Sequence, residues 1–110
     1  MTREETLYGW GRWPRRDCAV AAPDGPFDVA RALGPTTIAR GLGRSYGDSA
    51  LNPARTVATD RLNRLIGFDA DAGVLVAEAG VSLAEVIRVF LPRGFFPMVT
   101  PGTKFVTIGG

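Results

Sequence analysis

The feature of this sequence that most constrains its fold is a glycine-rich stretch, Ala-Arg-Gly-Leu-Gly-Arg-Ser-Tyr-Gly-Asp-Ser, at residues 39–49. It follows a run with β-branched residues that predicts a strand, and it places glycine at positions 41, 43 and 47. Because glycine has no Cβ, consecutive backbone N–H groups can turn toward one point and form a concave nest for phosphate oxygens. The stretch therefore predicts a loop that binds a pyrophosphate.

Side chains within the loop fit the same chemistry. Ser45 offers a hydroxyl donor, Arg40 and Arg44 offer positive charge, and Tyr46 offers a ring that can lie against a planar group or a ribose. The alternative is a mobile surface connection, because loops rich in glycine and serine are often linkers. Charged and aromatic residues stand between the glycines here, which favours a binding loop on a rigid scaffold.

Two better-known glycine loops do not match. A Walker loop needs Gly-Lys followed by Ser or Thr, whereas the only lysine, Lys104, is followed by Phe105. The dinucleotide fingerprint G-x-G-x-x-G fails because the third glycine comes one residue late. Asn52-Pro53, not an amphipathic helix, then follows the loop. The loop is therefore neither a P-loop nor a Rossmann turn.

Length and composition limit the class of protein. With 110 residues, 45% of them hydrophobic and 22% charged, the chain is one globular domain. Its net charge is only +2, and the densest basic group (Arg12, Arg15 and Arg16) is typical of a solvated segment. We therefore expect no nucleic-acid partner.

Histidine is absent and Cys18 is the single cysteine, so the familiar zinc sites, His-based triads and internal disulfides are excluded within these residues. The isolated carboxylates Asp48, Asp60 and Glu78 are interpreted as structural, and no catalytic residue is predicted. No apolar leader and no run as long as a membrane helix is found. We therefore expect no transmembrane segment and a cytoplasmic location.

The hydrophobic pattern predicts an α+β fold, a small mixed sheet with flanking helices. Residues 1–25 are expected to be an irregular N-terminal segment, and residues 26–110 to form the domain. The expected elements are a helix at 27–33, strands at 36–40 and 55–60, a hairpin at 65–69 and 74–79, a helix at 82–91 and an extended piece at 95–99. We expect Gly73 to supply a positive φ in the turn of this hairpin, and Ser82 with Glu85 to form a capping box at the start of the second helix.

Several segments together resemble a known family. The run Arg-Gly-Leu-Gly-Arg-Ser-Tyr-Gly-Asp at residues 40–48 is similar to the first pyrophosphate loop of the vanillyl-alcohol-oxidase-type (PCMH-type) FAD-binding domain. It looks most like the decaprenylphosphoryl-β-D-ribose oxidase-like FAD-linked oxidoreductases. Three further segments agree in order and spacing: Gly-Trp-Gly-Arg at 9–12, residues 69–81, and the run from Pro-Gly-Thr at 101–103 to Gly109-Gly110.

The resemblance implies FAD as the cofactor, with its diphosphate held by backbone amides of two loops. Many members of the superfamily attach the flavin covalently through a histidine at the position of Arg44, so non-covalent FAD is implied here. Carried over by position, the first loop comprises Ala39, Arg40, Gly41, Leu42, Gly43, Arg44, Ser45, Tyr46, Gly47, Asp48 and Ser49, and the second comprises Gly102, Thr107, Ile108, Gly109 and Gly110.

The resemblance further implies oxidation of a sugar hydroxyl to a ketone, with the flavin lying between this domain and a substrate domain. Val106, Thr107 and Ile108 begin an apolar element that meets a double glycine, so we expect a truncated domain whose substrate domain is missing or lies on a second polypeptide. We expect the chain alone to be inactive. The alternatives are a non-catalytic nucleotide-binding module and an inactive gene fragment.

Overall fold

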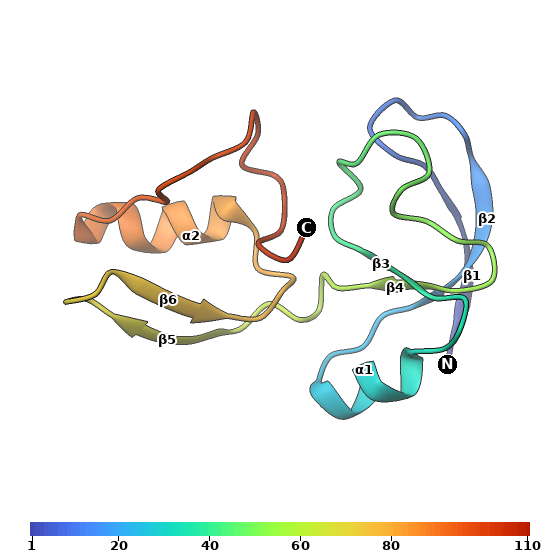
Figure 1. The fold of residues 1–110 in the computed structure, drawn as a ribbon, viewed down its shortest axis with the longest axis horizontal. Coiled ribbons are helices and arrows are strands. Elements are labelled where there is room, and N and C mark those ends of the chain that lie inside the picture. The colour runs from blue at the N-terminus through green and yellow to red at the C-terminus, as the bar shows by residue number, and fades with distance from the viewer.

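The computed structural model describes residues 1–110 as two lobes joined by a turn at Asp60 and Arg61 (Figure 1). We call residues 1–61 the N-terminal lobe and residues 62–110 the C-terminal lobe. The chain ends between them (Figure 1). The N-terminal lobe contains β1 (Arg3–Leu7), β2 (Arg16–Ala21), α1 (Pro26–Ala32), β3 (Ile38–Arg40) and β4 (Thr56–Ala58), and the C-terminal lobe contains β5 (Leu65–Asp69), β6 (Val74–Ala77), α2 (Leu83–Phe90) and the 3₁₀ turn η1 (Leu91–Arg93).

The N-terminal lobe is built on a mixed four-stranded sheet in the order β1-β2-β4-β3. β1 and β2 are antiparallel, whereas β4 runs parallel to both β2 and β3. The glycine-rich loop leaves the carboxyl end of β3. That end of parallel strands is where open α/β sheets commonly bind ligands. The C-terminal lobe has a two-stranded antiparallel sheet of β5 and β6 with α2 packed on one face. The predicted α+β class is confirmed.

The expectation that residues 1–25 are irregular is wrong. β1 pairs with β2 from Arg3↔Val20 to Leu7↔Arg16, and β2 continues the sheet through its pairing with β4. The sequence signal was weak because β1 is an edge strand made largely of charged and polar residues, with only Leu7 buried. Pairing with β2 overrides this low local propensity.

The other predicted helices and strands are present: the first helix is shifted by one residue, the strand at 65–69 has the predicted bounds, and the rest are shorter. Gly73 has φ +67° in the β5–β6 turn, as predicted. The Ser82 side chain caps α2 by accepting from the Glu85 N–H at 3.1 Å. The reciprocal half of the capping box is absent, because the Glu85 carboxylate binds Arg88 instead. The extended piece at 95–99 forms no strand.

The core is divided into three small clusters. Leu7, Cys18, Val20 and Leu51 pack on one side of the sheet, and a second cluster joins Ala32 of α1 to the sheet. In the C-terminal lobe the buried apolar residues are Val81, Val86 and Phe90, with Phe68, Leu75, Ala77, Val89 and Phe95 packed around them. No apolar cluster spans both lobes. Neither helix has the length and apolar character needed to cross a bilayer.

Polar contacts and a close backbone approach hold the lobes together. Arg64 binds the Glu78 carboxylate with two nitrogens, at 3.0 and 2.9 Å, and donates to the Asp24 carbonyl at 2.7 Å. Gly80 lies against the backbone of the junction, where its N–H donates to the Leu62 carbonyl at 2.7 Å and a Cβ would overlap the carbonyl of Thr59. The seam between the lobes is therefore tight at these two points.

A side chain at position 80 should loosen this junction. We expect Gly80→Ala to lower the free energy of unfolding by about 2 kcal/mol or more, because its Cβ overlaps backbone atoms that cannot rotate away. Urea unfolding followed by circular dichroism measures the loss. Gly67→Ala is the matched control, since a Cβ there meets nothing within 4 Å, and it should change stability by less than about 0.5 kcal/mol. Equal effects of the two variants would contradict the close approach.

The Arg64–Glu78 pair should make stability depend on pH. Hydrogen bonds from Arg64 lower the pKa of Glu78, so the unfolded chain takes up the proton first as pH falls. The contribution of the pair is present above the unfolded pKa and is lost as pH falls through the folded one. The urea midpoint should thus fall less steeply for Glu78→Gln than for the parent on acidification below about pH 5. Glu4→Gln, at a residue without an ion pair, should follow the parent. Identical curves for all three proteins would contradict this prediction.

Candidate functional site

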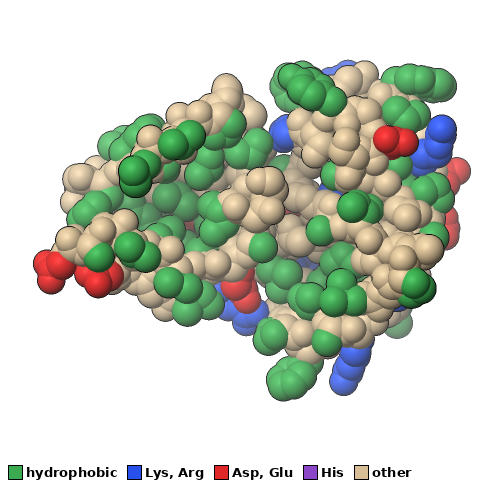
Figure 2. Space-filling model, in the orientation of Figure 1, with side chains coloured by type: hydrophobic (Ala, Val, Ile, Leu, Met, Phe, Trp, Pro, Cys, Tyr) green, Lys and Arg blue, Asp and Glu red, His purple; other side chains and the backbone are tan.

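The candidate site is a cleft of about 250 Å³ at the seam between the lobes. One wall is the start of the glycine-rich loop, and the other is the last part of the chain. Figure 2 shows the molecule hollowed between its two lobes, where Figure 1 places these two segments opposite each other. The cleft is lined by Gly41, Leu42, Gly43, Arg44, Ser45, Pro101, Val106, Thr107 and Gly110. The fold therefore brings together parts of both predicted loops that lie about 60 residues apart in sequence.

The backbone of the first loop has unused donors. No backbone N–H from Gly41 to Asp48 donates a hydrogen bond to a protein acceptor. Most of these residues are exposed, so their N–H groups are open to solvent or to a ligand. Two glycines with positive φ, Gly43 at +72° and Gly47 at +58°, bend this run. Such a backbone suits an anion with several oxygens.

Thr107 supplies a side chain from the opposite wall. The residue is 5% exposed, and its hydroxyl makes no hydrogen bond within the protein. It lies between two glycines, Gly41 and Gly110, and a Cβ on either would meet its Oγ1. The hydroxyl is therefore a free donor on the wall of the cleft that faces Gly41.

Arg40 serves the loop rather than the cleft. Its guanidinium donates to the Tyr8 carbonyl at 2.8 Å and to the Ala50 carbonyl at 3.3 Å, and it does not line the cleft. Burial lowers the pKa of Arg40. A Cβ on Gly43 would overlap the same guanidinium, so the glycine at 43 is needed for this contact as well as for its positive φ. The idea that Arg40 offers charge to a phosphate gives way to a structural role.

Arg44 remains at the cleft and ties its two walls. Its Nε donates to the carbonyl of Phe105 at 3.2 Å, and its guanidinium carbon lies 5.9 Å from the centre of the Trp10 ring. The backbone N–H of Trp10 donates to the Ser45 carbonyl at 2.8 Å. Gly9 lies so close to the loop that a Cβ would overlap the Ser45 carbonyl. The Gly-Trp pair of the β1–β2 turn thus braces the loop, a role that sequence reasoning missed.

The remaining predicted residues lie outside the cleft. Ala39 is in β3, Tyr46 is 79% exposed, and Gly47, Asp48 and Ser49 continue the turn away from the cleft, where Ser49 bonds back to the Tyr46 carbonyl. Gly102 borders a neighbouring hollow, while Pro101 and Val106 line the cleft in addition to the predicted set. The N–H groups of Ile108, Gly109 and Gly110 already donate to the carbonyls of Val81, Ala79 and Thr107. Because these three amides already have protein partners, the second wall offers a ligand the Thr107 hydroxyl as its donor.

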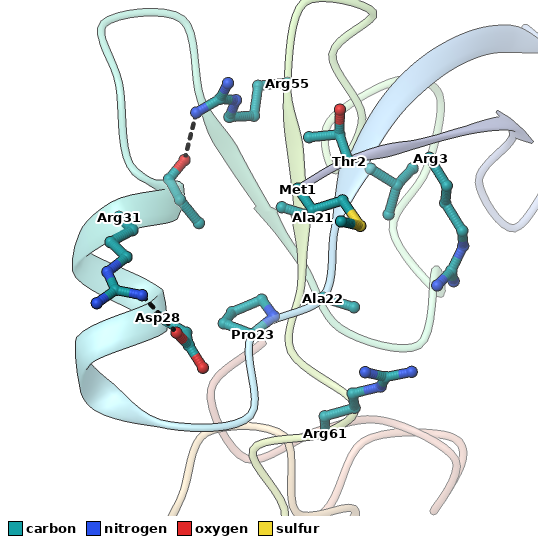
Figure 3. Close-up of a pocket in the computed structure, with 12 residues that line it drawn as sticks. Met1, Thr2, Arg3, Ala21, Ala22, Pro23, Asp28, Arg31, Arg55 and Arg61 are labelled. Carbon is teal, nitrogen blue, oxygen red and sulfur yellow. Dashed lines mark hydrogen bonds and ion pairs between the residues drawn. The ribbon is translucent and has the colours of Figure 1, made fainter.

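The largest hollow, of about 570 Å³, lies elsewhere and has no comparable chemistry. It is bordered by α1 and the ends of β1 and β2 (Figure 3). Its arginines do not converge in Figure 3: Arg55 donates to the Ala32 carbonyl, Arg31 lies 3.7 Å from Asp28, and Arg3 and Arg61 lie apart. We therefore place the functional site at the smaller cleft.

Comparison with known proteins gives the family of the chain. Residues 27–110 match the family model described as an FAD-binding domain. The chain belongs to this FAD-binding family. It is 38% identical to the decaprenylphosphoryl-β-D-ribose oxidase of Mycolicibacterium smegmatis over 117 aligned positions, which cover 99% of this chain and 25% of that protein. The predicted resemblance to this group is confirmed.

Solved structures support the fold. Two structures of cholesterol oxidase from Brevibacterium sterolicum, one of them a mutant, superpose over the whole chain with TM-scores of 0.86 and 0.76. Their sequences are only 16% and 19% identical to this chain, so this likeness concerns the fold alone. The chain spans about a quarter of the length of each of these relatives.

The residues present fit the diphosphate of FAD. A pyrophosphate carries several oxygen acceptors, and the cleft offers unpaired N–H groups, a free hydroxyl and glycines that let a ligand approach the backbone. Arg44 adds positive charge on the rim. The membership of the family and the donor set at the seam thus point to the same cofactor.

The contact across the seam can be tested by a double-mutant cycle. We expect Gly41→Ala to destabilise the chain by about 1–3 kcal/mol, because its Cβ overlaps the Thr107 side chain. In the background Thr107→Ala, the same substitution should cost much less, since the overlapping atoms are gone. Urea unfolding of the four proteins gives the coupling energy, expected to exceed about 0.5 kcal/mol. Additive effects would show that position 41 does not face Thr107.

Proposed function

We propose that residues 26–110, braced by the β1–β2 hairpin, bind FAD non-covalently as the flavin-binding portion of an FAD-linked oxidoreductase. The observation that carries the proposal is the run of backbone N–H groups from Gly41 to Asp48 that lack protein partners, the first half of which lines the seam cleft. In this assignment the glycine-rich loop holds the diphosphate with its amides, and the Thr107 hydroxyl donates from the other wall.

The side chains at hand support non-covalent attachment. These residues contain no histidine, and Arg44 occupies the loop position at which the family resemblance implies a histidine in covalent flavoproteins. Cys18 lies in β2, is fully buried in the cluster with Leu7 and Val20, and does not line the cleft. Flavin should therefore be released intact when the protein is denatured. The reduced, buried thiol is compatible with the cytoplasmic location that we also propose.

The reaction we propose is oxidation of a hydroxyl group on a polyprenyl-phosphate-linked pentose, by similarity to the M. smegmatis relative. A bound flavin would supply the hydride acceptor. The described residues bind and orient the cofactor, and the cleft contains no acidic side chain and no histidine that could take up the substrate proton. The groups that bind and deprotonate the sugar therefore belong to a further domain or a second polypeptide.

A non-catalytic nucleotide-binding module is the second candidate, since the cleft by itself offers only binding groups. The two candidates differ in what happens when the rest of an oxidase is supplied. A flavin-binding portion should yield sugar-dependent reduction of the bound flavin, whereas a module should bind the nucleotide and leave the flavin oxidised.

Flavin titration tests the site directly. We expect FAD to bind saturably and to raise the melting temperature of the chain, because a ligand that binds only the folded state stabilises it. Thr107→Val keeps the branched shape but removes the hydroxyl, and it should weaken FAD binding about tenfold, the effect of one hydrogen bond to a charged group. Thr2→Val, outside the cleft, is the control and should bind like the parent. A folded parent that binds no FAD would overturn the assignment, and equal affinity of the Thr107 variant would remove Thr107 from the site.

A further inference from the structure

An exposed group of aromatic side chains lies where the β1–β2 connection meets the glycine-rich loop. Trp10 and Trp13 of the connection are 58% and 76% exposed, and Tyr46 of the loop is 79% exposed. The two segments are joined through their backbones, because the Trp10 N–H donates to the Ser45 carbonyl at 2.8 Å and Gly9 lies against the same carbonyl. The three rings belong to none of the core clusters, so an ordered backbone holds them at the surface.

Unpaired positive charge accompanies these rings. Arg12 and Arg15 belong to the connection and Arg44 belongs to the loop, and none of the three forms an ion pair. The connection contains no acidic side chain. Of the acids that flank it, Asp17 in β2 accepts a hydrogen bond from a threonine hydroxyl at 2.6 Å, and Asp48 in the loop is exposed. The three arginines therefore exceed the single free carboxylate beside them.

The aromatic and basic side chains are interleaved. The guanidinium carbon of Arg15 lies 4.5 Å from the centre of the Tyr8 ring, and that of Arg44 lies 5.9 Å from the centre of the Trp10 ring. Figure 1 places the connection and the loop together at one end of the N-terminal lobe, and Figure 2 shows hydrophobic side chains projecting there with basic atoms beside them. We call this region the aromatic–arginine surface, which comprises Trp10, Arg12, Trp13, Arg15, Arg44 and Tyr46.

The aromatic–arginine surface borders the mouth of the cofactor cleft. Arg44 and Ser45 line the cleft, and Tyr46 is the next residue along the chain. Both tryptophans of the protein belong to the surface, and they precede the part of the chain that matches the FAD-binding family. A partner that binds this surface would therefore lie beside the cleft, held largely by residues outside the matched domain.

The chemistry of the surface fits the headgroup layer of a bilayer. Tryptophan and tyrosine rings lie in the membrane interface, where one end is apolar and the other is wet. Arginine binds phosphate through two parallel hydrogen bonds while its alkyl stem covers apolar surface. Single-stranded nucleic acid is bound by the same side chains, but in a basic groove that follows its backbone. Here they stand on a projecting turn of a chain whose net charge is only +2, which favours the bilayer.

We propose that the aromatic–arginine surface binds the headgroup layer of an anionic membrane and so holds the cofactor cleft at the lipid surface. The proposal rests on the proposed function, because a polyprenyl-phosphate-linked substrate is anchored in a bilayer by its polyprenyl chain. The binding is peripheral: the rings lie among the headgroups, and the arginines pair with lipid phosphates.

Vesicle binding tests the proposal on the chain as it is. The chain is sedimented with vesicles of phosphatidylcholine alone and of phosphatidylcholine mixed with phosphatidylglycerol. We expect about tenfold stronger binding to the anionic vesicles, and a loss of this preference as salt is added. Because both tryptophans lie in the surface, their fluorescence should shift to shorter wavelength on binding and should be quenched by brominated lipid.

Charge variants locate the binding surface. Arg12→Glu combined with Arg15→Glu should weaken binding to the anionic vesicles about tenfold or more. The matched control combines Arg61→Glu with Arg93→Glu, which changes the net charge equally at exposed residues outside the surface and should bind like the parent. Urea unfolding checks that each variant is folded. Equal losses in the two double variants would overturn the proposal, because binding would then follow net charge alone.

A ring variant tests the aromatic contribution. Trp13→Ser should weaken vesicle binding about tenfold, whereas Phe27→Ser, at an 82% exposed aromatic in α1, should not change it. A folded parent that binds neither kind of vesicle would overturn the proposal. Binding of a single-stranded oligonucleotide without binding of vesicles would overturn it in favour of a nucleic-acid surface. Vesicle binding is measured without FAD and FAD titration without vesicles, so failure of the surface is distinguished from failure of the cofactor site.

Discussion

The guanidinium of Arg40 fixes the glycine-rich loop by bonding to the carbonyl of Ala50, directly after the loop, and to that of Tyr8 in the β1–β2 connection. This contact depends on the missing side chain at Gly43, whose place the guanidinium fills. With both flanks tied, the loop keeps its N–H groups free without needing a ligand to hold its shape. Because the loop is already ordered in the folded chain, a ligand would lose less free energy to ordering it on binding, which favours tight binding.

The site is divided between two lobes that have separate cores. The loop belongs to the sheet of the N-terminal lobe, whereas Thr107 is held in the C-terminal lobe by the pairing of Ser82 with Thr107. Its position relative to the loop is set by the Gly41 contact, the Arg44–Phe105 hydrogen bond, the Gly80 junction and the hydrogen bond from Arg64 to the Asp24 carbonyl. Small residues and hydrogen bonds at the seam thus determine the geometry of the cleft.

Much of this arrangement could be predicted from sequence. The loop itself, the hairpin with Gly73, and the helix capped by Ser82 have strong local signals, and each is present. The edge strand β1 has no apolar alternation and was missed, because its pairing with β2 is set by tertiary context. The roles of Arg40 and Thr107 also could not be predicted from local sequence patterns. Whether an arginine faces a ligand or a carbonyl depends on residues such as Tyr8, which lies 32 positions away in sequence.

The absence of an apolar cluster across the seam has a consequence for cooperativity. Each lobe has its own small core, so the two should open as distinct cooperative units whose amide protons exchange with different free energies. The C-terminal lobe has three buried apolar residues against seven in the N-terminal lobe, so it should be the weaker unit. A diphosphate held by groups from both lobes would couple these units, so that neither opens without releasing it. The bound cofactor would then provide a contact common to both lobes, which their separate cores do not.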